Sequence, residues 1–313
     1  MTLQQLRYLC EVAKQGLNIS AAAAALHTSQ PGISKQIRQL EDELALTVYI
    51  RSGKRIVGIT AEGQAVLAAA ERMVREADNL RSLGKELRSP DEGILTIATT
   101  HTQARYVLPP VVQRFSDRYP AVKLILHQGN PEQVAEAVAN SAADLAIATE
   151  AVASNPALLT LPCYQWNRCV VVPPGHPLLT ATPLTLPALA QYPLITYDFS
   201  FTGRAKVNEA FEALGLTANV VLTALDSDVI KTYVELGLGV GILASMAFDS
   251  SRDPNLRAID ASHLFQPSIT RVALRRGHYL RAFHYHFIEL FAPQLTQSVV
   301  QQALLGDAPD FVI

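Results

Sequence analysis

The chain has 313 residues, of which 49% are hydrophobic, and this is enough for the cores of about two domains. Its 26 Lys and Arg and 28 Asp and Glu give a net charge of −2, which does not by itself predict a nucleic-acid partner. Residues 1–60, however, carry seven basic and four acidic side chains, so this segment is net +3 and the remainder is net −5. A basic module on an acidic body is expected when only one end of a protein meets phosphate.

The cysteines and the apolar segments restrict the location of the protein. Cys10, Cys163 and Cys169 lack the CxxC spacing of a zinc site and do not form a disulfide framework. No charged segment precedes an apolar one at the N-terminus, and the longest apolar run, residues 236–248, is shorter than the roughly 20 residues that span a bilayer. We therefore expect a cytoplasmic protein without a metal, a cofactor or a membrane partner.

Residues 20–44 predict two short helices joined by a tight turn. Ser20 is a suitable N-cap for the alanine-rich first helix, whose small side chains allow another helix to cross it closely. After the turn, Ser29 or Gln30 is expected to cap the second helix, with Pro31 tolerated in its first turn.

The second helix has one apolar and one polar face. The apolar stripe follows the i, i+4, i+7, i+11 pattern and consists of Ile33, Ile37, Leu40 and Leu44. Lys35 and Arg38 project from the opposite face, and Ser34 lies on its flank. This arrangement indicates a helix-turn-helix whose second helix enters the DNA major groove. Two packed helices in an ordinary helical domain are the alternative that this segment alone leaves open.

The neighbouring segments favour DNA binding. A helical stripe in the first 14 residues, made of Leu6, Leu9, Cys10 and Ala13, can close a three-helix core. Residues 48–60 form two β-prone runs around Ser52–Gly53, and three basic residues surround this turn: Arg51, Lys54 and Arg55. A basic hairpin beside a recognition helix is a wing that reaches the phosphate backbone or the minor groove.

The segment LRYLCEVAKQGLNISAAAAALHTSQPGISKQIRQLEDEL, followed by this wing and by Thr60–Gly63, resembles the LysR-type transcriptional regulators. Residues Ile59–Thr60 replace the family's usual Leu-Thr, which is a mild departure. The resemblance implies a winged helix-turn-helix in residues 1–60, with promoter DNA and RNA polymerase as partners. The residues expected at the DNA are Ser29, Gln30, Pro31, Ser34, Lys35, Arg38, Arg51 and Lys54, of which Arg51 and Lys54 would mainly touch phosphate.

A long helix is predicted from Ala61 to about Arg88, before residues 89–93 break it. Its stripe consists of Val66, Ala70, Met73, Ala77, Leu80 and Leu87. We expect a partner helix to cover this stripe, although a surface helix of its own domain is the alternative. In the family, this position (residues 61–89) is a linker helix that dimerises the DNA-binding modules, and the resemblance implies a homo-oligomer, a dimer of dimers.

The rest of the chain alternates between strand and helix patterns, which predicts parallel α/β sheets. The expected strands are 94–99, 122–129, 144–149, 167–175, 193–198, 219–225, 239–245, 256–260 and 271–276, and the expected helices 103–119, 131–142, 203–214, 227–237 and 280–295. Two α/β lobes of this kind resemble the periplasmic-binding-protein-like effector domain of the family, over residues 90–300. Lobe I would comprise about 90–161 and 268–300 and lobe II about 162–267, with crossings near Pro162–Gln165 and Phe265–Ser268; residues 301–313 would be a tail.

Three places supply hydroxyl groups where strands end and helices begin, which is where open parallel sheets bind ligands. They are residues 99–103, Thr149 and residues 199–204. Such a cleft suits a small anion or a zwitterion with a carboxylate. Any single threonine here is more simply explained as a helix cap, but three places on two lobes favour a pocket.

Five segments in this region sharpen the resemblance to the CysB branch of the family, the activators of sulfur assimilation and cysteine synthesis. They are TTHTQARY, ADLAIATEA, LPCYQWNR, FSFTGR and DSDVIKTYVELGLGVGILASMA. The resemblance implies an acetylated serine (N-acetylserine or O-acetylserine) as effector, with sulfate or thiosulfate as possible ligands of the pocket. Position by position, it assigns the ligand to Thr100, Thr102, Gln103, Thr149 and Thr202. The Cbl paralogue, an activator in sulfonate use and sulfate starvation, shares this pattern and stays an alternative.

Two other classes of protein compete. A solute-binding protein has similar lobes, but it lacks the basic N-terminal module and carries a signal peptide. His278, His284 and His286 suggest an enzyme, yet residues two apart on a helix face different directions and do not jointly bind a metal. With no nucleophile motif or carboxylate pair beside them, we expect a packing or surface role for these histidines and no catalytic residues.

Overall fold

The computed structural model describes residues 1–53, 55–199 and 201–306, except for the side chains of residues 150, 151, 202 and 203. The chain divides into two compact units, Met1–Arg88 and Ser89–Ile313, and each is described by itself. Within the described residues, no helix is both long and apolar enough to cross a membrane.

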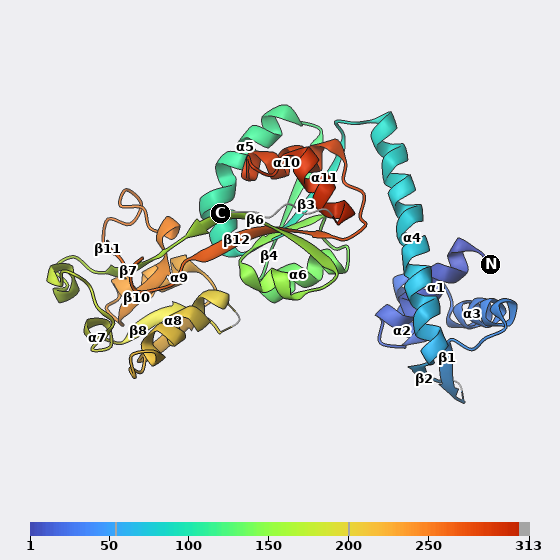
Figure 1. Cartoon of the computed structure of the whole chain (residues 1–313), viewed down its shortest axis with the longest axis horizontal. Coiled ribbons are helices and arrows are strands. Elements are labelled where there is room, and N and C mark those ends of the chain that lie inside the picture. The colour runs from blue at the N-terminus through green and yellow to red at the C-terminus, as the bar shows by residue number, and fades with distance from the viewer. Residues whose placement is uncertain (54, 200, 307–313) are drawn as a thin grey trace. The chain divides into compact units, whose positions relative to one another are not determined.

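The first unit is a helical module with a β-hairpin and a long final helix (Figure 1). Its elements are α1 (Leu3–Lys14), α2 (Ile19–Ala25), α3 (Gln30–Leu44), β1 (Tyr49–Ser52), β2 (Arg55–Ile59) and α4 (Ala61–Arg88). The periodic apolar residues of α1 and α3 meet in one core, where Leu9, Ile33 and Ile37 are fully buried. The hydroxyl of Tyr49 donates to the carbonyl of Leu9 at 2.6 Å and ties the hairpin to α1.

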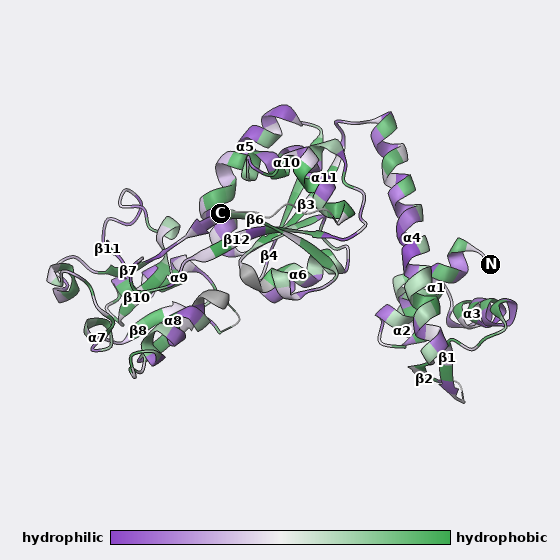
Figure 2. Cartoon of the chain, viewed as in Figure 1, coloured by the Kyte–Doolittle hydropathy of each residue, from purple (hydrophilic) through white to green (hydrophobic). Residues whose placement is uncertain are grey.

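Helix α4 has the predicted length, but the two halves of its stripe have different surroundings. Leu67 and Ala70 are buried, and Val66 and Val74 pack on the same core, so α1 covers the first half. The expected partner helix is therefore not needed to cover that half, which packs within its own unit. Beyond Ala70, hydrophobic residues alternate with polar ones along the helix (Figure 2), and Leu80 and Leu87 are 69% and 78% exposed.

The second unit contains two five-stranded sheets, and both are mixed where parallel sheets were expected. The first sheet has the order β4-β3-β5-β12-β6, made of β4 (Val122–Gln128), β3 (Gly93–Thr99), β5 (Leu145–Ala148), β12 (Ser268–Arg275) and β6 (Leu158–Trp166). The second has the order β11-β7-β10-β8-β9, made of β11 (Arg257–Asp260), β7 (Arg168–Val172), β10 (Val240–Ala244), β8 (Leu194–Tyr197) and β9 (Val220–Ala224).

Strands β6 and β12 explain why the first sheet is mixed. They pair antiparallel over their whole length, because the chain leaves the first lobe along β6 and returns along β12 (Figure 1). From the sequence we expected a connection over most of β6, with the first crossing near Pro162–Gln165. In the structure, the first sheet continues to Trp166 and the second begins at Arg168. The return at Ser268 agrees with the predicted second crossing.

Helices cover both faces of each sheet. On the first sheet, α5 (Leu108–Arg118), α10 (Ala282–Phe291) and α11 (Gln297–Leu305) pack on one face and α6 (Pro131–Ala139) on the other. On the second, α7 (Leu186–Leu189) and α8 (Thr202–Glu212) cover one face and α9 (Ser227–Glu235) the other. Helix α11 reaches into the segment expected as a tail, and Val300 and Ala303 join the core.

One predicted helix begins with an unusual turn. Residues Gln103–Val107 form a π-helical turn before α5, where one continuous helix was expected. Pro109 and Pro110 lack the amide hydrogens that would close regular turns on the carbonyls of Arg105 and Tyr106. Turns of this kind often occur at functional sites. Here the turn directs Gln103 and Tyr106 toward the contact between the two lobes.

Candidate effector pocket and DNA-binding surface

Side-chain caps set the beginning of both helices of the helix-turn-helix. Ser29 caps α3, as predicted, because its Oγ accepts from the amide of Gly32 at 3.3 Å. Helix α2 is capped by Asn18 and not by Ser20, since the Asn18 Oδ1 accepts from the amides of Ser20 and Ala21 at 3.0 and 3.1 Å. Ser20 thus lies inside the helix, because the N-cap is two residues earlier than expected.

The expected DNA-reading face of α3 is available to solvent. Lys35 and Arg38 are exposed and Ser34 is half-buried, while the opposite stripe lies in the core. At the start of the helix, Ser29, Gln30 and Pro31 are also exposed. The assignment of these six residues to DNA contact stays a prediction, and their geometry is compatible with it.

Arg51 of the wing, which is predicted to contact phosphate, also stabilises the fold of the first unit. The Arg51 Nη2 donates to the Glu41 Oε2 at 2.7 Å, and the other Glu41 oxygen accepts from the amides of Val48 and Tyr49 at 2.8 and 3.1 Å. Arg51 is half-buried and pairs with this carboxylate, and its predicted contact with phosphate stays a prediction. Sequence reasoning missed Glu41, because its place after an apolar stripe marks an ordinary helix surface.

Of the other two basic residues of the wing, the structure describes Arg55 only. Lys54 lies outside the described residues, so its predicted phosphate contact stays a prediction. Arg55 is exposed and borders a hollow together with Gln30 and residues 16–20. This hollow joins the wing to the start of α3, where a DNA backbone would pass beside the recognition helix.

In the second unit, four of the five predicted effector residues line one pocket between the lobes. The pocket has an empty volume of about 390 Å³, part of it open to solvent. Thr100, Thr102 and Gln103 follow strand β3, and Thr149 follows β5, its neighbour in the sheet. They meet because the carboxyl ends of parallel strands lie at the same edge. The side chain of Thr202 lies outside the described part of the chain.

The capping explanation for these threonines finds little support. Thr102 and Thr149 occupy N-cap positions, yet no side-chain capping bond from either appears in the described part of the structure. Thr99, which precedes the pocket, has a structural use, since its hydroxyl donates to the carbonyl of Ile147 at 2.8 Å. The hydroxyls of Thr102 and Thr149 are therefore not needed to start their helices.

Aromatic rings that sequence reasoning did not assign complete the pocket wall. Trp166 comes from the end of β6, and Tyr197 and Phe201 come from the second lobe. The Tyr197 hydroxyl lies 2.7 Å from the Ser227 Oγ, which in turn lies 3.5 Å from the Thr102 Oγ1 in the first lobe. Burial raises the pKa of Tyr197, so this hydroxyl stays neutral and serves as a hydrogen-bonding group.

Gln103 is oriented by neighbours on the first lobe. Its Nε2 donates to the Thr270 Oγ1 at 3.2 Å, and its Oε1 accepts from the Tyr164 hydroxyl at 2.5 Å. Burial raises the pKa of Tyr164 to about 12, which keeps that donor protonated. Because one of its two amide hydrogens goes to Thr270, Gln103 has one amide hydrogen left for a ligand.

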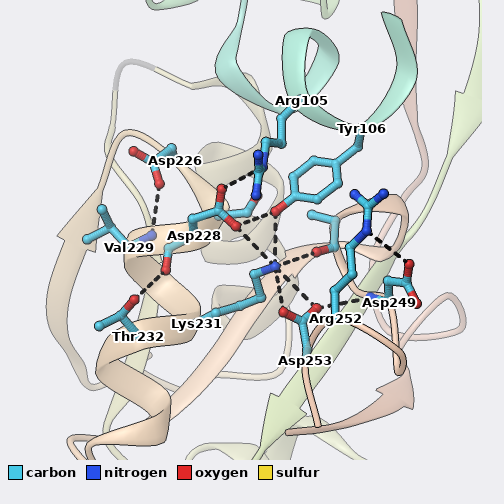
Figure 3. A network of polar contacts seen from close by, with 12 residues as sticks. Arg105, Tyr106, Asp226, Asp228, Val229, Lys231, Thr232, Asp249, Arg252 and Asp253 are labelled. Atoms are coloured by element: carbon cyan, nitrogen blue, oxygen red, sulfur yellow. Dashed lines mark hydrogen bonds and ion pairs between the residues drawn. The ribbon is translucent and has the colours of Figure 1, made fainter. Parts of the chain in front are cut away.

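Beside the pocket, a network of charged and polar groups joins the two lobes (Figure 3). Tyr106 and Arg105 from the π-helical turn contact Asp228 of α9, with 2.5 Å between the Tyr106 hydroxyl and Oδ1 and 3.2 Å between the Arg105 Nε and Oδ2. The Lys231 Nζ contacts Asp228 at 3.1 Å, Asp253 at 2.9 Å and the Tyr106 hydroxyl at 3.0 Å.

The electrostatics of this network favour the charged forms of Lys231 and Asp228. Burial opposes the charge of Lys231, but hydrogen bonds with Tyr106, Asp253 and Asp228 outweigh it and raise the pKa of the amine. For Asp228, burial alone would raise the pKa, while contacts with Tyr106 and Lys231 lower it below the usual value. The contact between the lobes is therefore ionic over the neutral pH range.

The histidines of α10 lie in the fold and face different surroundings. The His284 Nδ1 accepts from the amide of Arg281 at 3.0 Å, and its Nε2 lies 3.8 Å from the Asp144 Oδ2. The His286 ring packs edge-on against Tyr119. Among the described residues, no group of three or more His, Cys, Asp or Glu side chains is placed to hold a metal.

Comparisons with known proteins agree with both units. The family "Bacterial regulatory helix-turn-helix protein, lysR family" matches residues 3–64, and "LysR substrate binding domain" matches residues 88–296. The chain is similar to "HTH-type transcriptional regulator CysB" of Burkholderia cenocepacia, with 51% identity over 99% of each chain. It is as similar to "HTH-type transcriptional regulator SsuR" of the same organism, with 51% identity over 96% of this chain and 97% of the other.

The second unit also has a solved relative. The cofactor-binding domain of the Cbl transcriptional regulator shares 42% identity with a TM-score of 0.66, covering 68% of this chain and 93% of that one.

These matches and the two units define a transcriptional regulator with a winged helix-turn-helix and a two-lobed ligand-binding domain. The chain belongs to the LysR family of transcriptional regulators, whose members bind promoter DNA and small-molecule effectors and form oligomers. Within the family it stands in the CysB-like branch, the group that the sequence motifs indicated.

Proposed function

We propose that this chain regulates genes of sulfur assimilation and cysteine biosynthesis, mainly as an activator, by binding promoter DNA and sensing a small sulfur-pathway metabolite. The observation that carries the proposal is the convergence of Thr100, Thr102, Gln103 and Thr149 on one pocket between the lobes. Hydroxyl and amide donors in a confined site suit an anionic or zwitterionic ligand. An acetylated serine, sulfate and thiosulfate are ligands of this kind.

The proposal assigns a task to each part of the chain. Residues 1–60 bind the promoter, residues 61–89 dimerise and residues 90–300 bind the effector. The exposed apolar residues beyond Ala70 of α4 support dimerisation, since such a stripe on a helix is stabilised by a second helix. We further propose that two dimers form a tetramer and that the DNA-bound assembly contacts RNA polymerase.

The test is calorimetric titration of the full chain with N-acetylserine, O-acetylserine, sulfate and thiosulfate. Thr100→Val keeps the shape of the side chain and removes the hydrogen bond. Loss of a hydroxyl that donates to a charged group costs roughly 1.5–3 kcal/mol, so we expect a drop in affinity of about 10- to 100-fold. Thr223→Val, at an exposed position of β9, is the matched control and should bind like the parent. Equal affinity of Thr100→Val and the parent would refute the assignment of the pocket.

A regulator of the Cbl type, acting on sulfonate use and sulfate starvation, is the second candidate, favoured by the 42% identity to the Cbl domain. The same titration separates the two. A response of DNA binding to an acetylated serine supports the first candidate, whereas a response to a sulfate-derived ligand alone supports the second.

A further inference from the structure

The side chain of Arg204 is buried, and the structure describes no polar partner for two of its three nitrogens. It is 4% exposed, and its Nε and Nη1 have no hydrogen-bond partner in the described part of the chain. A guanidinium group stays protonated in proteins, so this side chain carries its charge into the interior. Burial lowers the pKa of Arg204, as expected for a cation removed from water. A buried charge of this kind is normally paired, so an anion beside it would be stabilised.

The guanidinium is directed toward the start of helix α8. Arg204 is the third residue of this 11-residue helix, and its Cζ lies 5.0 Å from the ring centroid of Phe199, which precedes the helix. Side chains on a helix lean toward its N-terminus, and the contact with Phe199 shows that this one extends beyond the first turn. The partial positive charge of a helix N-terminus and a buried cation therefore occur at one place, and both favour a bound anion.

This place adjoins the effector pocket. The carbonyl of Phe201, whose ring lines the pocket, accepts a hydrogen bond from the Arg204 amide at 2.9 Å. The predicted ligand residues of the first lobe offer hydroxyl and amide groups, and no Lys or Arg is among the described residues that line the pocket. Arg204 is not itself among these lining residues; it is a cation of the second lobe whose backbone amide bonds to one of them.

We propose that Arg204, with the first turn of α8, binds the anionic group of the effector, a carboxylate or a sulfate, while the threonines of the first lobe bind the rest of the ligand. This inference rests on the proposed function and names a binding residue for its pocket. Carboxylate and sulfate share the geometry that a guanidinium fork recognises through paired hydrogen bonds. A negative charge on the ligand is then a requirement for tight binding.

The test compares charged and uncharged probes on the full chain. Calorimetry measures binding of sodium sulfate, of N-acetyl-L-serine and of its uncharged analogue N-acetyl-L-serinamide, with sodium chloride used to match ionic strength. Arg204→Met removes the charge and keeps an unbranched side chain, and Arg204→Lys keeps the charge without the fork. Arg252→Met, at an exposed position that contacts Asp249, is the control for loss of one surface charge.

We expect Arg204→Met to bind the better of the two anions roughly 10- to 100-fold more weakly than the parent, with Arg204→Lys in between. The uncharged analogue should bind weakly to all variants alike. Without an added anion, Arg204→Met should unfold at the parent's temperature or above it, because an unpaired buried charge is removed.

The results that would overturn the inference are distinguishable. If the parent binds either anion and Arg204→Met binds it as tightly, Arg204 does not hold the anion, although the proposed pocket stands. A lower unfolding temperature of Arg204→Met without added anion, together with unchanged affinity, would identify a packing role. If the parent binds neither sulfate nor N-acetyl-L-serine, the effector class under the proposed function fails together with this inference.

Discussion

Replacing Lys231 by methionine should destabilise the second unit strongly. The ammonium group, in a side chain only 9% exposed, contacts Asp228, Asp253, the Tyr106 hydroxyl and the carbonyl of Ala247 within 3.1 Å. Without it, the Asp253 carboxylate, 11% exposed, is left as an uncompensated buried charge. Breaking a buried pair in this way costs about 3–5 kcal/mol. For a domain of this size the unfolding temperature should fall by roughly 6–20 °C.

The single tryptophan provides the assay. Trp166 lies at the junction of the two lobes, so its fluorescence reports thermal unfolding of the second unit within the full chain. Lys123→Met, at an exposed position of β4, is the control and should stay within about 0.5 kcal/mol of the parent. Adding Asp253→Asn to Lys231→Met should recover part of the lost stability, because the unpaired charge of the Asp253 carboxylate is removed. A Lys231→Met variant as stable as the parent would refute this account of the network.

Three further predictions concern other parts of the chain. Arg38→Ala should reduce the discrimination between operator and random DNA, measured by fluorescence anisotropy across a salt series; an unchanged ratio would remove this residue from the reading face. Leu80→Glu should place a charge in the proposed dimer contact of α4, so light scattering should detect smaller species than the parent forms. An unchanged mass at low concentration would show that the dimer contact lies elsewhere. The Asp144 carboxylate accepts from the Thr96 amide at 2.7 Å, and although burial raises its pKa, contacts with His284 and this amide lower it below the usual value. The ionised carboxylate therefore stabilises the fold fully above the unfolded pKa of about 3.9, and this stabilisation is lost as the pH falls through the lower folded value. Asp144→Asn should therefore make the free energy of unfolding depend less on pH below about pH 4. An unchanged pH dependence in this range would contradict the linkage.

The features that the sequence predicted well are those governed by neighbours along the chain. The Ser29 cap and the stripe of Ile33, Ile37 and Leu40 depend on contacts within one or two helical turns, so periodicity and residue type are sufficient. Thr100 and Thr149 could be placed near one another for a similar reason. Each follows a strand, and the rule for the carboxyl ends of parallel strands brings such residues to one edge.

The family motifs extended these predictions to the class of protein, because they are local in sequence. They located the helix-turn-helix and most residues of the pocket, and the comparisons confirm the family. They did not assign Trp166 or Tyr197 to the pocket, because this role depends on where the second lobe lies against the first.

The features that only the tertiary structure decided are those set by partners far apart in the chain. The antiparallel pairing of β6 with β12 joins segments about 100 residues apart, and no local pattern states which strand a given strand meets. The same holds for charges: Lys231 reads as one polar position on an amphipathic helix, yet it is buried between Asp253 and Tyr106. Arg204 reads as a surface cation in the first turn of a helix, and its burial follows from the packing around α8. Residue type and periodicity determine which elements form and which faces they bury, whereas the partners of a buried charge depend on contacts that exist only once the lobes have assembled.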